Sequence, residues 1–175
     1  MFSGGTDTST VPIEWALVEL LANPEKMALL QNELAEVVGN AKLVDISDIP
    51  NLPYLTAVVK ETMRMHLVVP LVLSHKLMQS CELFGYEILA DTQVFVNVWA
   101  ISHDPCVWDN PSEFLPRRFL EMSQASVHGP KNYVLSFLLF IDTNFLSHGL
   151  LFASFLINMY YVIFIARFQC QLEVS

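Results

Sequence analysis

The first third of the chain carries apolar side chains at helical spacing, beginning with residues 12–22. Apolar positions in this stretch recur at i, i+3 and i+4, which predicts a helix with one buried stripe. Pro12 fits only the first turn of a helix, because deeper inside it would remove a backbone hydrogen bond. The polar residues before it are therefore either a helix start or part of a longer, kinked helix. The buried stripe would consist of Ile13, Ala16, Leu17, Leu20 and Leu21.

A second helix is predicted to follow directly. Asn23-Pro24-Glu25 combines an N-cap side chain, a proline for the first turn and an acid near the positive end of the helix dipole. Helical spacing then continues to Gly39, a residue suited to the position just after a helix. Residues 40–53 contain two prolines and are predicted to be a loop.

A third helix is predicted over residues 54–66, where apolar residues again keep helical spacing. Its inner side would consist of Leu55, Val58, Val59 and Thr62.

Beyond Pro70 the pattern changes to short β-prone runs at 68–73, 82–88 and 93–98. Polar residues separate these runs, as in a small sheet. Residues 103–118 contain three prolines and predict an ordered meander without a helix. The predicted fold class is therefore mainly α with a small β-sheet.

Charge divides the chain near residue 131. Residues 1–131 hold 16 of the 18 acidic and 8 of the 9 basic residues, whereas 132–175 hold only Asp142, Arg167 and Glu173. The net charge of −9 argues against nucleic-acid binding, which needs a basic surface to neutralise phosphates. We therefore expect a first domain over 1–131 and a hydrophobic, helix-like tail over 132–175.

The tail has two interpretations. In residues 150–166, ten of 17 side chains are Leu, Ile, Phe or Val, which is typical of a transmembrane helix at the lower length limit of about 17 residues. The alternative is that 132–175 is a translated intron or a shifted reading frame.

Three short motifs could carry chemistry, although each also has a purely structural interpretation. Gly4-Gly5-Thr6-Asp7-Thr8 combines glycines that allow close backbone approach with groups that relay protons, or it supplies capping hydroxyls to a helix start. Glu61 and Arg64 are neighbours on one helix face, as in a surface ion pair. Pro116-Arg117-Arg118-Phe119 places an arginine beside an aromatic ring, as in a proline-broken surface loop.

Taken together and in this order, the motifs resemble the cytochrome P-450 family of haem-thiolate monooxygenases, plant microsomal type. The likeness runs over residues 1–122. Residues 99–105, Trp-Ala-Ile-Ser-His-Asp-Pro, are similar to the family's Trp-Ala-Ile-Gly-Arg-Asp-Pro, and 116–119 to its Pro-Glu-Arg-Phe. The amino-acid sequence at 13–16 and at 74–76 is similar to that of the geraniol 8-hydroxylase-like branch. The resemblance implies a partial P-450 fold, beginning inside the long oxygen-binding helix.

The resemblance also implies roles for single residues. Asp7 and Thr8 would deliver protons to iron-bound dioxygen, and Gly4 and Gly5 would open the helix groove where oxygen sits. Glu61, Arg64 and Arg118 would form a buried structural triad. His75 would contact a haem propionate, and Leu71, Val72 and Leu73 would line the substrate pocket. Arg117, His103 and Leu67 depart from the family pattern, which has Glu, Arg and Pro at these positions.

The family's iron ligand has no counterpart in this sequence. That ligand is the cysteine of a glycine-rich loop, Phe-x-x-Gly-x-Arg-x-Cys-x-Gly, whose thiolate binds the haem iron. Cys170 has no glycine near it, and Cys81 and Cys106 precede Arg118, so no residue is nominated as the metal ligand. The three cysteines are also too few and too scattered for a disulfide framework.

By resemblance the function is haem-dependent hydroxylation of a small apolar, terpenoid-like substrate at the endoplasmic reticulum membrane. Electrons would come from an NADPH-dependent reductase. Because the cysteine loop is missing, we expect this chain itself to be incomplete and inactive. The alternatives are a non-catalytic truncated fragment and a tail-anchored membrane protein that acts through interaction alone.

Overall fold

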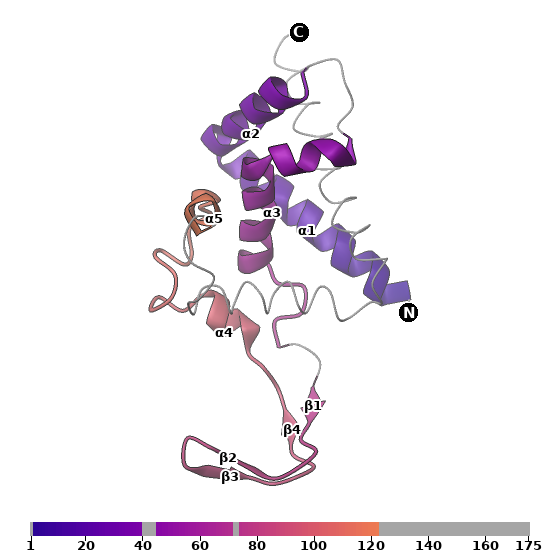
Figure 1. The fold of residues 1–175 in the computed structure, drawn as a ribbon, viewed down its shortest axis with the longest axis vertical. Coiled ribbons are helices and arrows are strands. Elements are labelled where there is room, and N and C mark those ends of the chain that lie inside the picture. The colour runs from indigo at the N-terminus through magenta and orange to yellow at the C-terminus, as the bar shows by residue number, and fades with distance from the viewer. Residues whose placement is uncertain (1, 40–44, 72–73, 123–175) are drawn as a thin grey trace.

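The computed structural model describes residues 2–39, 45–71 and 74–122, with the side chains of 2–9 and 46 outside the description. The described part is mainly helical with small sheets, which confirms the predicted fold class (Figure 1). Its helices are α1 (Phe2–Ala22), α2 (Pro24–Val37), the 3-10 helix η1 (Ile46–Asn51), α3 (Pro53–Met65), α4 (Val98–Ser102) and α5 (Arg117–Met122). Its strands are β1 (His75–Lys76), β2 (Cys81–Leu83), β3 (Tyr86–Ile88) and β4 (Gln93–Val94).

The sequence analysis left open whether the first helix starts near Pro12 or extends further toward the N-terminus, and α1 is the longer form. It runs from Phe2 through Pro12 to Ala22, so the polar stretch is helical and the interpretation of Pro12 as a helix start is wrong. The buried stripe is narrower than predicted. Ala16 and Leu20 are buried, whereas Leu21 is 51% exposed.

Helix α2 has the predicted bounds, but Asn23 does not cap it with its side chain. The Asn23 Nδ2 instead donates to the carbonyl of Glu19, 2.8 Å away, near the end of α1. Its Oδ1 accepts from Lys26 Nζ at 2.6 Å. Asn23 therefore does hydrogen-bond to the end of a helix, as an N-cap residue would, but it binds a free carbonyl at the end of α1 and not an amide at the start of α2. Gly39 has φ +77°, the left-handed conformation expected after a helix.

Helix α3 lies at the centre of the helical part, where it contacts α1, α2, α4 and α5 and crosses α1 in Figure 1. Its predicted inner side is confirmed, because Leu55, Val58, Val59 and Thr62 are all buried. The loop predicted over 40–53 is wrong in part, since it contains η1. The main core cluster consists of Ala16, Leu20, Met27, Leu30, Leu34, Val38, Leu52, Tyr54, Leu55, Val58, Val59 and Phe114.

A second, smaller cluster lies between α3, α4 and α5. Leu67, which stands where the related family has proline, packs against this cluster. Leu67 therefore contributes apolar surface to the cluster directly after α3. The cluster consists of Ala57, Val98, Trp108 and Phe119.

The strands form two separate two-stranded antiparallel sheets, β1 with β4 and β2 with β3, at one end of the molecule (Figure 1). The predicted strand at 68–73 is wrong over its described residues, because the chain turns there and β1 begins at His75. The predicted run 82–88 is a hairpin. Its two turn residues, Phe84 and Gly85, have φ 51° and 81°, which matches the twist of the flanking strands.

Two predictions concern parts of the chain beyond β4. The chain forms no helix between α4 and α5, as predicted for the proline-rich meander at 103–118. The last two residues of that predicted meander, however, belong to α5, which begins at Arg117. The tail at 132–175 lies outside the described residues. Among the residues that are described, no helix has the length and apolar character to cross a bilayer.

Candidate functional site

The carboxylate of Glu61 is the centre of a buried polar cluster between α3, α4 and α5. Its side chain is fully buried. Oε1 accepts from Arg118 Nε at 3.0 Å and from the amide of Leu115 at 2.9 Å. Oε2 accepts from Arg64 Nε at 2.8 Å, and Arg64 Nη2 donates to Oε1 at 2.9 Å. The structure thus brings together the three residues that the sequence analysis grouped as a triad.

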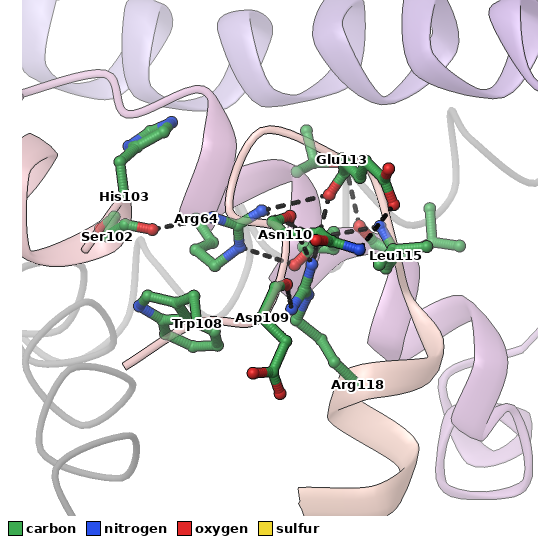
Figure 2. A network of polar contacts seen from close by, with 12 residues as sticks. Arg64, Ser102, His103, Trp108, Asp109, Asn110, Glu113, Leu115 and Arg118 are labelled. Carbon is green, nitrogen blue, oxygen red and sulfur yellow. Dashed lines mark hydrogen bonds and ion pairs between the residues drawn. The ribbon is translucent and has the colours of Figure 1, made fainter. Parts of the chain in front are cut away.

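Arg64 is as buried as its partner and reaches two further segments of the chain. It lies one helical turn after Glu61, so the pair forms within α3. Its Nη1 donates to the carbonyl of Ser102 at 2.8 Å, and its Nη2 to the carbonyl of Glu113 at 3.4 Å. One side chain therefore ties α3 to the end of α4 and to the meander before α5 (Figure 2).

Arg118 fastens the meander to the same carboxylate from the other side. Its guanidinium donates to the carbonyls of Asp109, Asn110 and Glu113 at 2.8, 3.2 and 3.3 Å. Asn110 has φ 48°, a left-handed conformation that asparagine tolerates better than most residues. Main-chain carbonyls thus supply the acceptors that one carboxylate cannot give to two guanidiniums.

Trp108 lies against both arginines. The guanidinium carbons of Arg64 and Arg118 are 5.3 and 5.9 Å from the centre of its ring system, within the range of cation–π attraction. The ring is buried, and its Nε1 donates to the carbonyl of Ile101 at 3.1 Å. Sequence reasoning missed this residue. The available signal was a tryptophan within the proline-rich stretch 103–118.

Ser102, at the end of α4, has a fully buried side chain whose Oγ makes no hydrogen bond within the described residues. The related family has glycine at this position of the Trp-Ala-Ile motif. The main-chain carbonyl of Ser102, by contrast, accepts from Arg64. The backbone of Ser102 therefore serves the cluster, while its hydroxyl is a buried polar group without compensation.

A second carboxylate supports α3 from its other end. The residue before this helix is Leu52, which has no capping side chain. Glu33 of α2 takes over that role, because its carboxylate accepts from the amides of Tyr54 and Leu55 at 2.7 and 2.9 Å. Burial raises the pKa of Glu33 above its ordinary 4.5, and the two amide hydrogen bonds act in the opposite direction. Burial is also the main reason why the pKa of Tyr54 is raised.

The contacts described for the Glu61 cluster do not include the other predicted site residues. Gly4, Gly5, Asp7 and Thr8 belong to the first turns of α1, and their side chains lie outside the description. Pro12 has no N–H to donate to the carbonyl of Thr8, so the helix ladder is interrupted at this motif.

His75 and the predicted pocket residues lie after α3. His75 is exposed in β1, where its backbone pairs with Val94. Leu71 is 49% exposed, and Val72 and Leu73 lie outside the described residues.

The cysteines of the described part do not fit a haem-thiolate site. Cys81, in β2, and Cys106, in the meander, are free thiols with exposed side chains. A haem ligand needs a thiolate on a shielded loop whose backbone amides turn toward it. The described residues also contain no group of three or more His, Cys, Asp or Glu side chains that could hold a metal ion. Cys170 lies outside the described residues.

The comparisons with known proteins agree on one family. A sequence model of the family described as Cytochrome P450 matches residues 1–137. The chain is 56% identical over 120 residues to Cytochrome P450 76C1 of Arabidopsis thaliana, covering 69% of this chain and 23% of that protein. It is 48% identical over 121 residues to Geraniol 8-hydroxylase of Swertia mussotii, covering 69% of this chain and 24% of that protein.

A solved structure gives the same answer. A zebrafish cytochrome P450 determined with progesterone superposes with a TM-score of 0.66 and 36% identity, covering 80% of this chain and 35% of that one. The chain spans about a quarter of the length of the curated relatives it matches. The family uses haem, and the relatives place this chain in the geraniol 8-hydroxylase-like branch of the plant enzymes. Because the family match covers well over half of its residues and the fold agrees, the chain belongs to the cytochrome P450 family.

Proposed function

We propose that this chain is part of a haem-dependent monooxygenase that hydroxylates a small apolar, terpenoid-like substrate. The observation that carries the proposal is the buried cluster of Glu61, Arg64 and Arg118, whose members come from the motifs by which the sequence resembles the family. Two relatives named Geraniol 8-hydroxylase, from Swertia mussotii and Catharanthus roseus, support the substrate class.

In this proposal the Glu61 cluster holds the meander and the end of α4 against α3. It sets the shape of the framework on which a haem-binding loop would rest. The polar turn of α1 serves the reaction itself, with Gly4 and Gly5 leaving room beside the helix and Asp7 and Thr8 holding and passing protons. Haem, when bound, supplies the activation of oxygen.

The remaining parts of the site follow α3. His75 is proposed to contact a propionate of the haem, and the segment 71–73 to line the substrate pocket. An NADPH-dependent reductase supplies the electrons, and the endoplasmic reticulum membrane is the proposed location.

A second proposal is favoured by the chemistry of the thiols. Since Cys81 and Cys106 are exposed and Cys170 lacks neighbouring glycines, the 175-residue chain by itself would not hold haem through a thiolate. It would then be a non-catalytic fragment, or an interaction protein anchored by residues 132–175. The first domain of the chain, residues 1–131, would still fold toward the family's architecture.

Haem titration tests the second proposal. The purified 175-residue chain would be mixed with haem, reduced, and exposed to carbon monoxide, with a Cys81→Ser, Cys106→Ser double variant as the control for adventitious thiol binding. We expect no thiolate-type, red-shifted Soret band. If that band appears in both proteins, Cys170, the one thiol left in the double variant, holds the haem and the fragment proposal is wrong. Sequencing the transcript across codons 122–140 would then test whether the tail arises from unspliced message.

A further inference from the structure

Helix α1 and the end of α3 are joined by a second contact that the sequence motifs do not include. The indole of Trp15 and the imidazole of His66 lie parallel, with ring centroids 3.9 Å apart and an angle of 3° between their planes. His66 Nε2 lies 2.8 Å from Glu19 Oε1. The ring of His66 is therefore held both on its face, by Trp15, and at its edge, by Glu19.

The geometry of the two helices accounts for this arrangement. Trp15 and Glu19 are four residues apart in α1 and so lie on the same face of the helix. His66 is the C-cap residue directly after α3, and its amide donates to the carbonyl of Thr62 at 2.8 Å. The side chains of His66 and Glu19 are 18% and 17% exposed, so this contact is largely shielded from water.

The position of the contact gives it a consequence for the proposed site. Trp15 follows Pro12 by one turn, and the polar motif of residues 4–8 lies directly beyond that proline. Among the described side chains of α1, the core residues Ala16 and Leu20 anchor its second half. On the α3 side, the chain leaves His66 toward Leu71 and His75. The contact thus stands between the two segments to which the proposed function assigns chemistry.

We propose that Trp15, Glu19 and His66 form an interhelix clasp that positions the polar turn of α1 relative to the segment after α3. This role rests on the proposed function, because that function assigns proton transfer to the polar turn of α1 and haem and substrate contacts to the segment after α3. The clasp residues are positioning residues, since in this proposal they act on the polar turn through the backbone of α1.

The clasp is independent of the charged contacts made elsewhere by α3. Arg64 is held by Glu61, which lies in the cluster with α4 and α5. Glu33 binds the opposite end of the helix, at the amides of Tyr54 and Leu55. Removal of the clasp should therefore loosen α1 without dismantling the Glu61 cluster.

Hydrogen exchange followed by mass spectrometry on the full 175-residue chain tests the proposal. In a His66→Leu variant, which loses both the parallel stack and the carboxylate contact, we expect the amides of residues 2–15 to exchange about tenfold faster. A Trp15→Phe variant keeps an aromatic face for His66 and should stay within about twofold of the wild type. Amides in α2 and in the middle of α3 should keep their wild-type rates in both variants.

The matched control is Trp99→Leu. Trp99 stacks on His103 with ring centroids 4.6 Å apart, but both residues belong to α4 and its end, so the stack joins no two helices. This variant should leave α1 exchange unchanged. The proposal is wrong if His66→Leu leaves residues 2–15 unaffected, or if it accelerates α1, α2 and α3 equally, which is the mark of a general stabilising contact. Because exchange is read without haem, failure of haem binding would not alter either result.

Discussion

Replacing Glu61 with glutamine removes the one negative charge from a cluster that contains two guanidiniums. The side chain keeps its size and can still accept from Arg64 or from the amide of Leu115, but its amide nitrogen must face an arginine donor. Arg64, which is fully buried, then loses the counter-charge that the described residues give it. The substitution therefore tests charge compensation while leaving packing nearly unchanged.

The expected magnitude follows from this burial. Breaking a buried ion pair by removing one partner costs about 3–5 kcal/mol, because the remaining charge cannot be solvated. The carbonyls of Ser102 and Glu113 still accept from Arg64, so we place the loss of unfolding free energy at the lower end, at about 3 kcal/mol. With a urea m-value of about 2 kcal/mol/M, the midpoint of unfolding should fall by about 1.5 M.

Urea unfolding followed by far-UV circular dichroism measures this change. Glu25→Gln is the matched control, because the Glu25 carboxylate is 67% exposed where it pairs with Lys26 at 3.6 Å, and its loss should change the unfolding free energy by less than about 1 kcal/mol. If Glu61→Gln does not fold, the same urea unfolding measurement is made on Arg118→Lys. This variant keeps the positive charge but loses the fork that reaches the carbonyls of Asp109 and Asn110, at an expected cost of about 1–2 kcal/mol.

The reasoning would be refuted if Glu61→Gln and Glu25→Gln changed the unfolding free energy by the same small amount. Such a result would mean that water reaches the cluster in solution and screens the two guanidiniums.

Three further predictions concern other parts of the described chain. Ser102→Ala removes a buried hydroxyl without a partner while keeping the carbonyl that Arg64 uses, so thermal unfolding should show a gain of about 1 kcal/mol; a lower melting temperature would contradict this. Phe84→Asn replaces a 93% exposed aromatic residue at φ 51° with one that tolerates this backbone, and exchange of the β2–β3 hairpin amides should slow about two- to fivefold. For Glu33→Gln the direction of the change in unfolding free energy with pH follows from the raised pKa of Glu33. The folded wild type binds the proton more tightly than the unfolded chain, so its unfolding free energy should fall relative to the variant as the pH rises from 4.5 through the raised value, and parallel pH profiles would count against the burial of Glu33.

Local sequence signals predicted the helices well and the strands less well. Proline fixes its own φ angle and glycine admits the left-handed conformation that follows a helix, so the bounds of α2 and the start of α3 followed from Pro24, Gly39 and Pro53. The strands are two or three residues long, and a run such as 82–88 has the same composition whether it is one strand or a hairpin. The turn at Phe84 carries no asparagine or aspartate that would have announced it.

Cap residues illustrate a similar limit. Asn23 is an ordinary N-cap signal, yet its side chain bonds to the end of α1, because the two helices are close enough to compete for it. Glu33 lies in the middle of α2 and would be assigned to a solvated helix face. It caps α3 because packing of α2 against α3 brings its carboxylate to the free amides of Tyr54 and Leu55.

The sequence by itself determined the helical frame, the order of the motifs and the absence of a glycine-rich cysteine loop, because these depend on residue identity and spacing along the chain. The tertiary structure decided which polar groups meet. Glu61 and Arg118 are 57 positions apart, and Glu19 and His66 are 47 apart. No local periodicity encodes such distances. They follow from the way α3 packs against its neighbours, where burial removes water and makes each charge depend on the partner that the fold provides.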